Sequence, residues 1–94
     1  MIELLTAFYN RACGDNRLSP SHLSLYVALL HERCVACEWR SIDKVRIMQL
    51  AKICSRVTYH KVIRELFSYG YIDYRPGYEK GKTMVRMRFV IGDL

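Results

Sequence analysis

Residues 53–66 read ICSRVTYHKVIREL and contain the clearest helix signal in the 94-residue chain. Ser55 is of a type that caps helix starts, and apolar residues follow it at positions 59, 62, 63 and 66. This spacing buries one face of a helix over residues 55–68, which Gly70 then ends. The opposite face carries Arg56, Thr58, His60, Lys61 and Arg64. A short helix with a packed back and a cationic front suits the major groove of DNA.

A second helix is predicted just before this one, over about residues 44–52. Asp43 is a favourable N-cap, and Ile47, Leu50 and Ala51 have the spacing of an inward face. Ile53 and Cys54 then form a turn between the two helices. The resulting order is helix, short turn, helix.

Two strands are predicted after the second helix. Residues 71–75 alternate, with Ile72 and Tyr74 on one side, and Pro76-Gly77 turns the chain outward. The return strand places Val85, Met87 and Phe89 on one face and Arg86 and Arg88 on the other. This alternation is typical of a half-buried antiparallel hairpin.

The first forty residues predict two further helices and a short strand. A helix over residues 2–13 ends at Gly14-Asp15-Asn16, and Ser19-Pro20 begins another that runs to about residue 31 or 33. The strand is predicted over residues 39–42. The expected buried stripe of the second helix consists of Leu23, Tyr26, Val27 and Leu30.

Length and composition favour one small α+β domain over residues 1–94, with its core in residues 19–91. Half of the residues are apolar, which supports a packed core. No apolar run is long enough to span a bilayer, and the start of the chain lacks the features of a signal peptide. We therefore expect a cytoplasmic protein whose four cysteines are reduced thiols.

The net charge of +6 is unevenly distributed along the chain. Residues 1–39 hold three basic and four acidic residues. Residues 40–65 hold seven basic and two acidic residues, and residues 75–88 hold five basic and one acidic residue. Such asymmetry is expected of a surface that binds a polyanion.

The order of predicted elements over residues 19–91 resembles the winged helix-turn-helix fold. The segment SRVTYHKVIRELFSYGYIDY, residues 55–74, is similar to the second helix and first wing strand of GntR- and MarR-type bacterial regulators. The run IMQLAKICSRVTYHKVIRELFSYGYIDYRPGYEKGKTMVRM, residues 47–87, resembles small proteins of conjugative and mobilisable elements from Bacteroides-type bacteria. The resemblance implies a three-helix core with an added N-terminal helix and a C-terminal β-hairpin wing.

The resemblance also implies which residues meet DNA. Polar residues early in the second helix of such proteins contact bases and phosphates, and Val57 lies among them here. Its apolar side chain would either touch a thymine methyl group or reduce hydrogen-bond readout. The wing would lie over the backbone or the minor groove. The expected DNA-binding residues are Lys44, Arg46, Ser55, Arg56, Val57, Thr58, His60, Lys61, Arg64, Arg75, Lys80, Lys82 and Arg86.

Cysteine chemistry and catalysis are weaker interpretations. Cys34 and Cys37 have a spacing that zinc tolerates, but a second compact ligand pair is missing, so Cys13, Cys54, His31 or His60 would have to complete the site. A redox pair is an equal alternative, and packing at a helix end is favoured over both. No motif gives His22 or His60 a catalytic partner. We therefore expect no enzyme activity, no metal and no cofactor.

The sequence thus predicts a sequence-specific protein that binds double-stranded DNA, most simply a transcriptional regulator. One alternative is an accessory factor for excision, replication or transfer of a mobile element. Another is a winged helix that contacts proteins, and a third is a switch through Cys34 and Cys37. The helix at residues 1–14 either completes the core or forms a homodimer.

Overall fold

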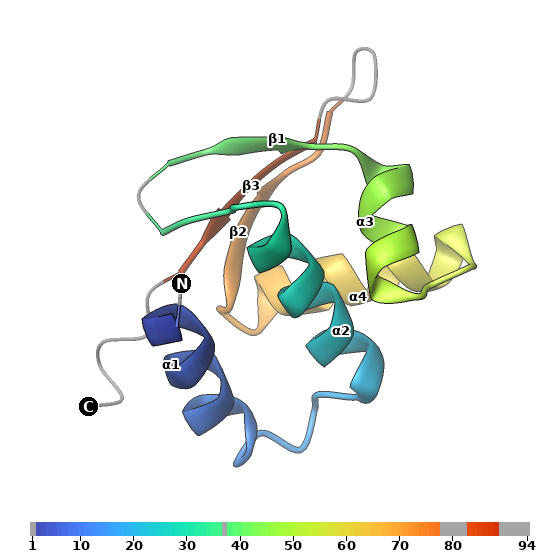
Figure 1. Cartoon of the computed structure of the whole chain (residues 1–94). Helices are drawn as coiled ribbons and strands as arrows, with labels where there is room; N and C mark the ends of the chain where they lie inside the picture. The colour runs from blue at the N-terminus through green and yellow to red at the C-terminus, as the bar shows by residue number, and fades with distance from the viewer. Residues whose placement is uncertain (1, 37, 78–82, 89–94) are drawn as a thin grey trace.

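The computed structural model describes residues 2–36, 38–77 and 83–88 and shows a winged-helix-like α+β fold (Figure 1). The elements follow one another in the predicted order, and Phe89 lies outside the described residues. The helices are α1 (Ile2–Ala12), α2 (Pro20–His31), α3 (Lys44–Ala51) and α4 (Arg56–Ser68). The strands are β1 (Arg40–Ile42), β2 (Ile72–Arg75) and β3 (Thr83–Met87). No helix among these residues is long and apolar enough to cross a membrane.

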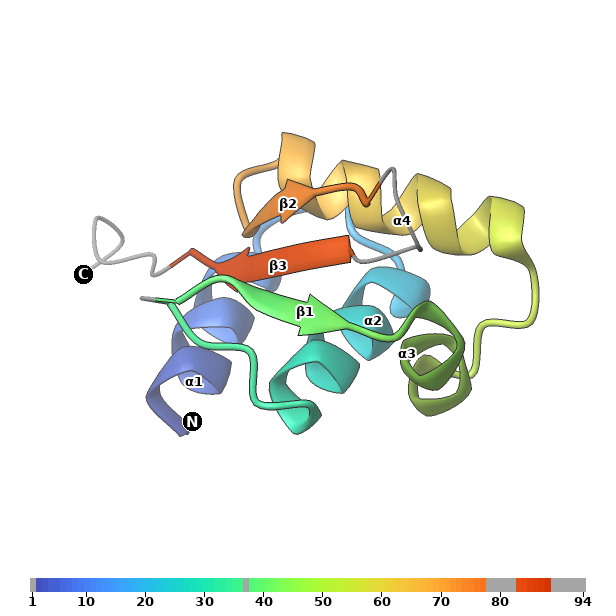
Figure 2. The ribbon, with the colours of Figure 1, turned by 90° about the horizontal axis from the view of Figure 1, so that it is seen from above.

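The three strands form one antiparallel sheet in the order β1-β3-β2. Val85 in the central strand pairs with Arg40 of β1 on one side and Tyr74 of β2 on the other. The side chains of Ile72, Val85 and Met87 are buried against the helices. Seen from above, the strands lie over the helices, and no described helix covers their outer face (Figure 2).

Local capping explains where the paired helices begin and end. The Asp43 carboxylate accepts a hydrogen bond from the Val45 amide at 3.0 Å, and Ser55 Oγ accepts one from the Thr58 amide at 3.3 Å. Both predicted N-caps are therefore confirmed. Gly70 follows α4 with φ of +90°, a left-handed conformation that favours glycine.

The predicted inner face of α4 is confirmed. Its side chains Tyr59, Val62, Ile63 and Leu66 are all buried, together with Ile47 and Ala51 of α3. These residues pack with α2 and with the inner face of the sheet in one cluster. The outward face of α4 is consequently fixed in position by a packed core behind it.

The predicted stripe of α2 was partly wrong. Tyr26 and Leu30 are buried, but Val27 is 40% exposed and Leu23 is only half-buried. Leu25 and Leu29 are fully buried instead. The helix PSHLSLYVALLH is apolar around most of its circumference, so its neighbours rather than its own periodicity select the buried side.

The N-terminal helix is part of the core. Phe8 is 1% exposed, and its ring stacks on Tyr26 with the ring centroids 3.8 Å apart. The Arg11 guanidinium donates a hydrogen bond to the Tyr69 carbonyl at 2.9 Å, which ties α1 to the end of α4. Tyr9 remains 44% exposed on the outer side of α1.

Candidate nucleic-acid interface

The exposed side of α4 and the start of α3 form a basic surface. Arg56, Lys61 and Arg64 are exposed on α4, while Lys44 is half-buried at the first position of α3. His60 is half-buried among them. We call Lys44, Arg56, His60, Lys61 and Arg64 the α4 basic surface.

Three of these basic groups lower the pKa of His60. The pKa of His60 is lowered from its ordinary value of 6.5, first by burial and then by the charges of Lys44, Arg64 and Arg56. His60 is therefore neutral at pH 7 in the protein without a ligand. Within the described residues, no carboxylate forms an ion pair with Arg56, Lys61 or Arg64. The surface is thus positively charged and suited to an anion.

The acidic residue of α4, Glu65, contacts α2 and lines the same hollow as Lys61. Its Oε1 lies 2.9 Å from Nε2 of His22, a residue that is 5% exposed. The Ser19 amide donates to His22 Nδ1 at 2.9 Å, so Nε2 carries the proton that is shared with Glu65. Ser19 Oγ is also 2.8 Å from Nδ1. The three residues cap α2 and connect it to α4, a partnership that the sequence analysis missed for His22.

The other residues that were predicted to contact DNA are not members of the α4 basic surface. Ser55 caps α4, Thr58 is half-buried, and Val57 is 79% exposed at the first turn of α4. Arg46 is directed elsewhere, with Nε 3.7 Å from Oε1 of Glu32. The predicted contacts Lys80 and Lys82 lie outside the described residues.

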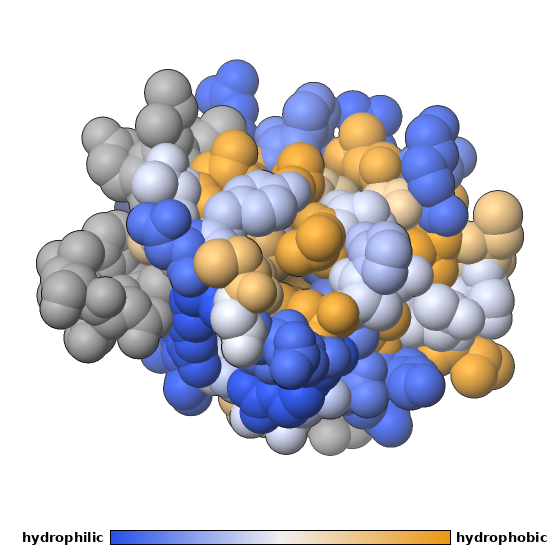
Figure 3. All heavy atoms as spheres, turned by 90° about the horizontal axis from the view of Figure 1, so that it is seen from below, coloured by the Kyte–Doolittle hydropathy of each residue, from blue (hydrophilic) through white to orange (hydrophobic). Residues whose placement is uncertain are grey.

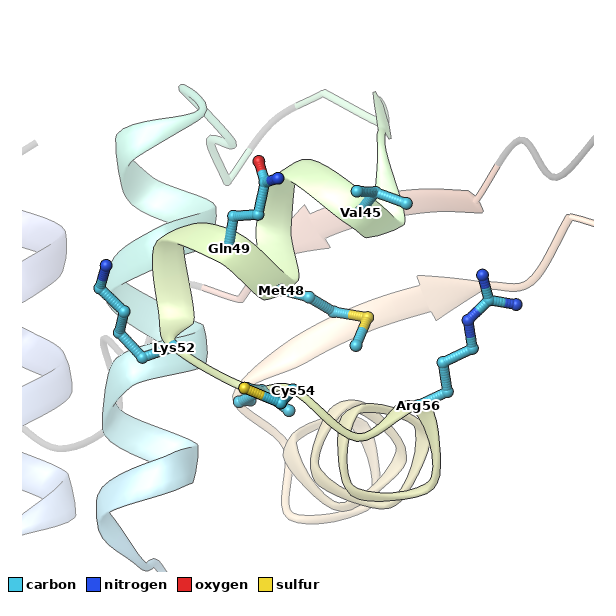
Figure 4. Close-up of a pocket in the computed structure, with 7 residues that line it drawn as sticks. Val45, Met48, Gln49, Lys52, Cys54 and Arg56 are labelled. Atoms are coloured by element: carbon cyan, nitrogen blue, oxygen red, sulfur yellow. The ribbon is translucent and has the colours of Figure 1, made fainter.

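An apolar hollow of about 450 Å³ lies between α3 and the start of α4. We call it the α3–α4 hollow. Figure 4 shows Met48 extending from α3 towards α4, while Arg56 rises from the start of α4. Val45, 52% exposed, and Cys54 also line the hollow. The surface on this side of α3 and α4 is therefore partly apolar as well as cationic.

A second apolar hollow, of about 430 Å³, involves α1, α2 and α3. We call it the α1–α2 hollow. Tyr9, Leu23, Val27 and Leu50 contribute its apolar lining, and two of these side chains, Tyr9 and Val27, are at least 40% exposed. Figure 3 shows apolar side chains gathered between polar ones on the helical side of the molecule.

The predicted contacts Arg75 and Arg86 belong to a different surface, the outer face of the sheet. Their guanidinium carbons lie 4.3 Å and 4.7 Å from the ring centroid of Trp39. Asp73 accepts hydrogen bonds from Arg86 at 2.8 Å and Arg88 at 2.8 Å. We call Trp39, Asp73, Arg75, Arg86 and Arg88 the outer sheet cluster.

Sequence reasoning did not find Trp39, Asp73 or Arg88 as members of a cluster. Trp39 precedes β1, Asp73 lies in β2, and Arg88 follows β3. The strand order β1-β3-β2 brings these distant segments side by side. The only available signal was the alternation of residues 84–88, which predicts that Arg86 and Arg88 share a face.

The structure does not favour cysteine chemistry at Cys34. Its side chain is 1% exposed, and burial raises the pKa of the thiol to about 11, so it stays protonated at neutral pH. Its expected partner Cys37 lies outside the described residues. In the part of the chain that the structure describes, no three or more metal-ligating side chains gather.

The fold and the helix pair place the chain among winged-helix-like α+β proteins. Comparison with protein-family models, with curated proteins and with solved structures finds no match to the chain.

Proposed function

We propose that the protein binds double-stranded DNA sequence-specifically through the α4 basic surface and acts as a transcriptional regulator. The observation that carries this proposal is the concentration of Lys44, Arg56 and Arg64 around His60. Lys61 is also exposed on α4, and no ion-paired carboxylate is described on Arg56, Lys61 or Arg64. Neutralising phosphates at such a surface releases counterions and supplies much of the affinity for DNA.

The first turn of α4 would supply sequence readout. Arg56 is exposed there and has the donor geometry to bind guanine bidentately. Val57, which is 79% exposed, would contact a thymine methyl group. Lys61 and Arg64, further along the helix, would bind phosphates and set its register in the groove. The hairpin with Lys80 and Lys82 would brace the neighbouring backbone.

The charge-removing variants Lys61→Gln and Arg64→Gln test this docking. Each should weaken duplex binding and lower the slope of log affinity against log salt by about one unit. Arg33→Gln is the matched control, because Arg33 is exposed after the end of α2 and is not part of the α4 basic surface. If Lys61→Gln and Arg64→Gln both bind duplex DNA as wild type does, the docking is wrong.

Selection of binding sites from random duplexes tests the sequence specificity. Enrichment of a two-fold-related motif would indicate a dimer that reads sequence, and an asymmetric motif would indicate a monomer. Retention without any motif would contradict specific readout. Absence of binding at low salt would contradict DNA binding altogether.

We also propose that two copies of the chain pair through the α1–α2 hollow. The hollow offers exposed Tyr9 and Val27 beside half-buried Leu23 and Leu50, and pairing would bury them. Val27→Asp should then convert the dimer to a monomer in sedimentation velocity. A wild-type protein that sediments as a monomer at all concentrations would contradict the pairing.

A protein-binding role is the second candidate, and the α3–α4 hollow favours it. Val45 and Met48 make this hollow apolar beside the very turn that would approach DNA. An apolar side chain of a partner protein would fit such a surface. Under this candidate, duplex affinity at low salt is negligible, and Met48→Glu abolishes partner binding while Lys61→Gln does not.

A further inference from the structure

The outer face of the sheet is a second, separately built surface. Met84 and Arg86 of β3 alternate with the buried residues Val85 and Met87, so they point away from the helices. The register places Asp73 opposite Arg86 and places Arg75 opposite Met84 on this face. The described helices all lie on the other side of the strands (Figure 2). No helix among the described residues therefore covers this face of the three strands.

Asp73 holds two arginines of this face, Arg86 and Arg88, in position. Asp73 Oδ2 accepts from Nε and Nη2 of Arg86 at 3.0 Å and 2.8 Å, and its Oδ1 accepts from Nε of Arg88 at 2.8 Å. Burial raises the pKa of Asp73, but hydrogen bonds from Arg88 and Arg86 outweigh it and leave that pKa lowered. The carboxylate thus stays ionised and orients two guanidinium groups.

The aromatic member of the cluster is Trp39, whose ring is half-buried. Two guanidinium groups approach this ring, that of Arg75 from β2 and that of Arg86 from β3. Guanidinium planes and indole rings are the groups on which proteins stack unpaired bases. With three arginines against one aspartate, the cluster also keeps a net positive charge for phosphates.

A duplex does not present exposed base faces to such a surface. The bases of a duplex are stacked on one another, and only their edges are accessible in the grooves. A single strand presents base faces and phosphates together, which matches one indole ring with guanidinium groups beside it. We propose that the outer sheet cluster binds single-stranded nucleic acid, on a face separate from the α4 basic surface.

The arrangement gives the protein two kinds of contact with nucleic acid. The buried side chains Tyr59, Val62 and Leu66 fix α4 beneath the sheet, so its basic surface and the outer sheet cluster belong to different layers. Together with the proposed duplex site, on which this point rests, the cluster would suit a place where a duplex meets an unpaired strand. The single-strand site does not depend on the duplex site, and each is tested by its own variants.

Trp39 is the single tryptophan of the chain, so its fluorescence reports on this site directly. Full-length protein is titrated with (dT)12, with (rU)12, with a blunt 16-base-pair duplex and with polyglutamate at low salt. Either single strand should quench the fluorescence and bind in a salt-dependent manner. The two oligonucleotides distinguish DNA from RNA, and binding of either one supports the proposal.

Variants assign the binding to a surface. Arg75 is exposed, so Arg75→Gln should fold normally and weaken single-strand binding by roughly fivefold or more, the loss of one stacking partner. Its duplex affinity should stay unchanged. Arg64→Gln is the matched control, with weakened duplex binding and unchanged single-strand binding.

Three outcomes would overturn the proposal. The first is the absence of both quenching and binding with either oligonucleotide at low salt. The second is an Arg75→Gln variant that binds single strands as wild type does, or loses duplex affinity equally. The third is polyglutamate that quenches and binds as strongly as the oligonucleotides, which would reduce the cluster to a general anion site.

Discussion

Nε2 of His22 lies 2.9 Å from Oε1 of Glu65, and the two residues are 43 positions apart in the chain. This hydrogen bond joins the first turn of α2 to the middle of α4. The Glu65 side chain keeps 30% of its surface exposed. The contact therefore supports the packing of α2 against α4.

Replacing Glu65 should reveal the structural part of this contact. Glu65→Ala leaves the buried Nε2–H of His22 without an acceptor, which should cost about 1–3 kcal/mol of unfolding free energy. Glu65→Gln keeps an acceptor oxygen and should cost less. Urea denaturation measures both values, and an Ala variant as stable as wild type would contradict the assignment.

Tyr59 carries a hydroxyl group that has no hydrogen-bond partner among the described residues, although the side chain is 1% exposed. Tyr59→Phe removes this unsatisfied group, so its free energy of unfolding should be unchanged or higher by about 1 kcal/mol. Tyr71→Phe is the matched control, because Tyr71 donates to Asp15 Oδ2 at 2.8 Å. Its loss should cost about 1.5–3 kcal/mol. Equal effects of the two substitutions in thermal and urea unfolding would refute this distinction.

Gly70 turns the chain from α4 into β2 with φ of +90°. Gly70→Ala should destabilise the protein by about 1–2 kcal/mol, because a Cβ atom is disfavoured in that conformation. The added atom would also lie 3.4 Å from Nη2 of Arg11. Gly14→Ala meets only the Arg11 carbonyl, at 4.0 Å, and should leave the unfolding free energy nearly unchanged. A tolerated Gly70→Ala would show that the turn adopts another conformation.

Duplex binding should depend on pH through His60. The lowered pKa means that His60 binds few protons at pH 7 in the unbound protein, whereas a nearby phosphate raises the pKa again. The complex then binds more protons than the free protein does. Affinity should therefore rise as the pH falls from 8 to 6, by up to about tenfold for each unit by which DNA raises the pKa of His60. Fluorescence anisotropy at constant ionic strength measures this change in duplex affinity. His60→Gln should lose this pH dependence and His31→Gln should keep it; an unchanged slope in His60→Gln would exclude His60 as its source.

The cysteines should differ sharply in reactivity. Cys13 and Cys54 are exposed, while Cys34 is buried with its pKa raised to about 11 by that burial. In a Cys37→Ser variant, an aromatic disulfide reagent should titrate two thiols rapidly and the third only in urea. Rapid reaction of all three thiols in the folded protein would show that the Cys34 thiol is accessible, and would support a chemical role for it.

Local chemistry explains why much of the fold was predictable from the sequence. Asp43 and Ser55 act on amides two or three residues away, and Gly70 needs only its own conformation. The inner face of α4 was predictable because the apolar residues Tyr59 and Ile63 are four positions apart among charged residues. The exposure of Val27 was not predictable, since α2 is apolar on several sides.

The two candidate surfaces differ in the same way: one depends on local spacing along a helix, and the other depends on strand pairing. The α4 basic surface lies mostly on one helix, so spacing alone brought Arg56, Lys61 and Arg64 together. The contact between Trp39 and Arg86 depends on β1 pairing with β3, a choice of strand order that no local spacing records. The bond between His22 and Glu65 likewise depends on how two helices cross.

The position of β3 as the central strand has a consequence for how the chain matures during synthesis. In the described part of the chain, β1 and β2 each pair with β3, and β3 comes after both in sequence. A ribosome-bound chain that has not yet released residues 83–87 therefore carries two strands with unsatisfied edges and an open helical layer. The sheet can therefore form only after Thr83–Met87 have been synthesised, and we expect a chain truncated before Thr83 to aggregate more readily than wild type.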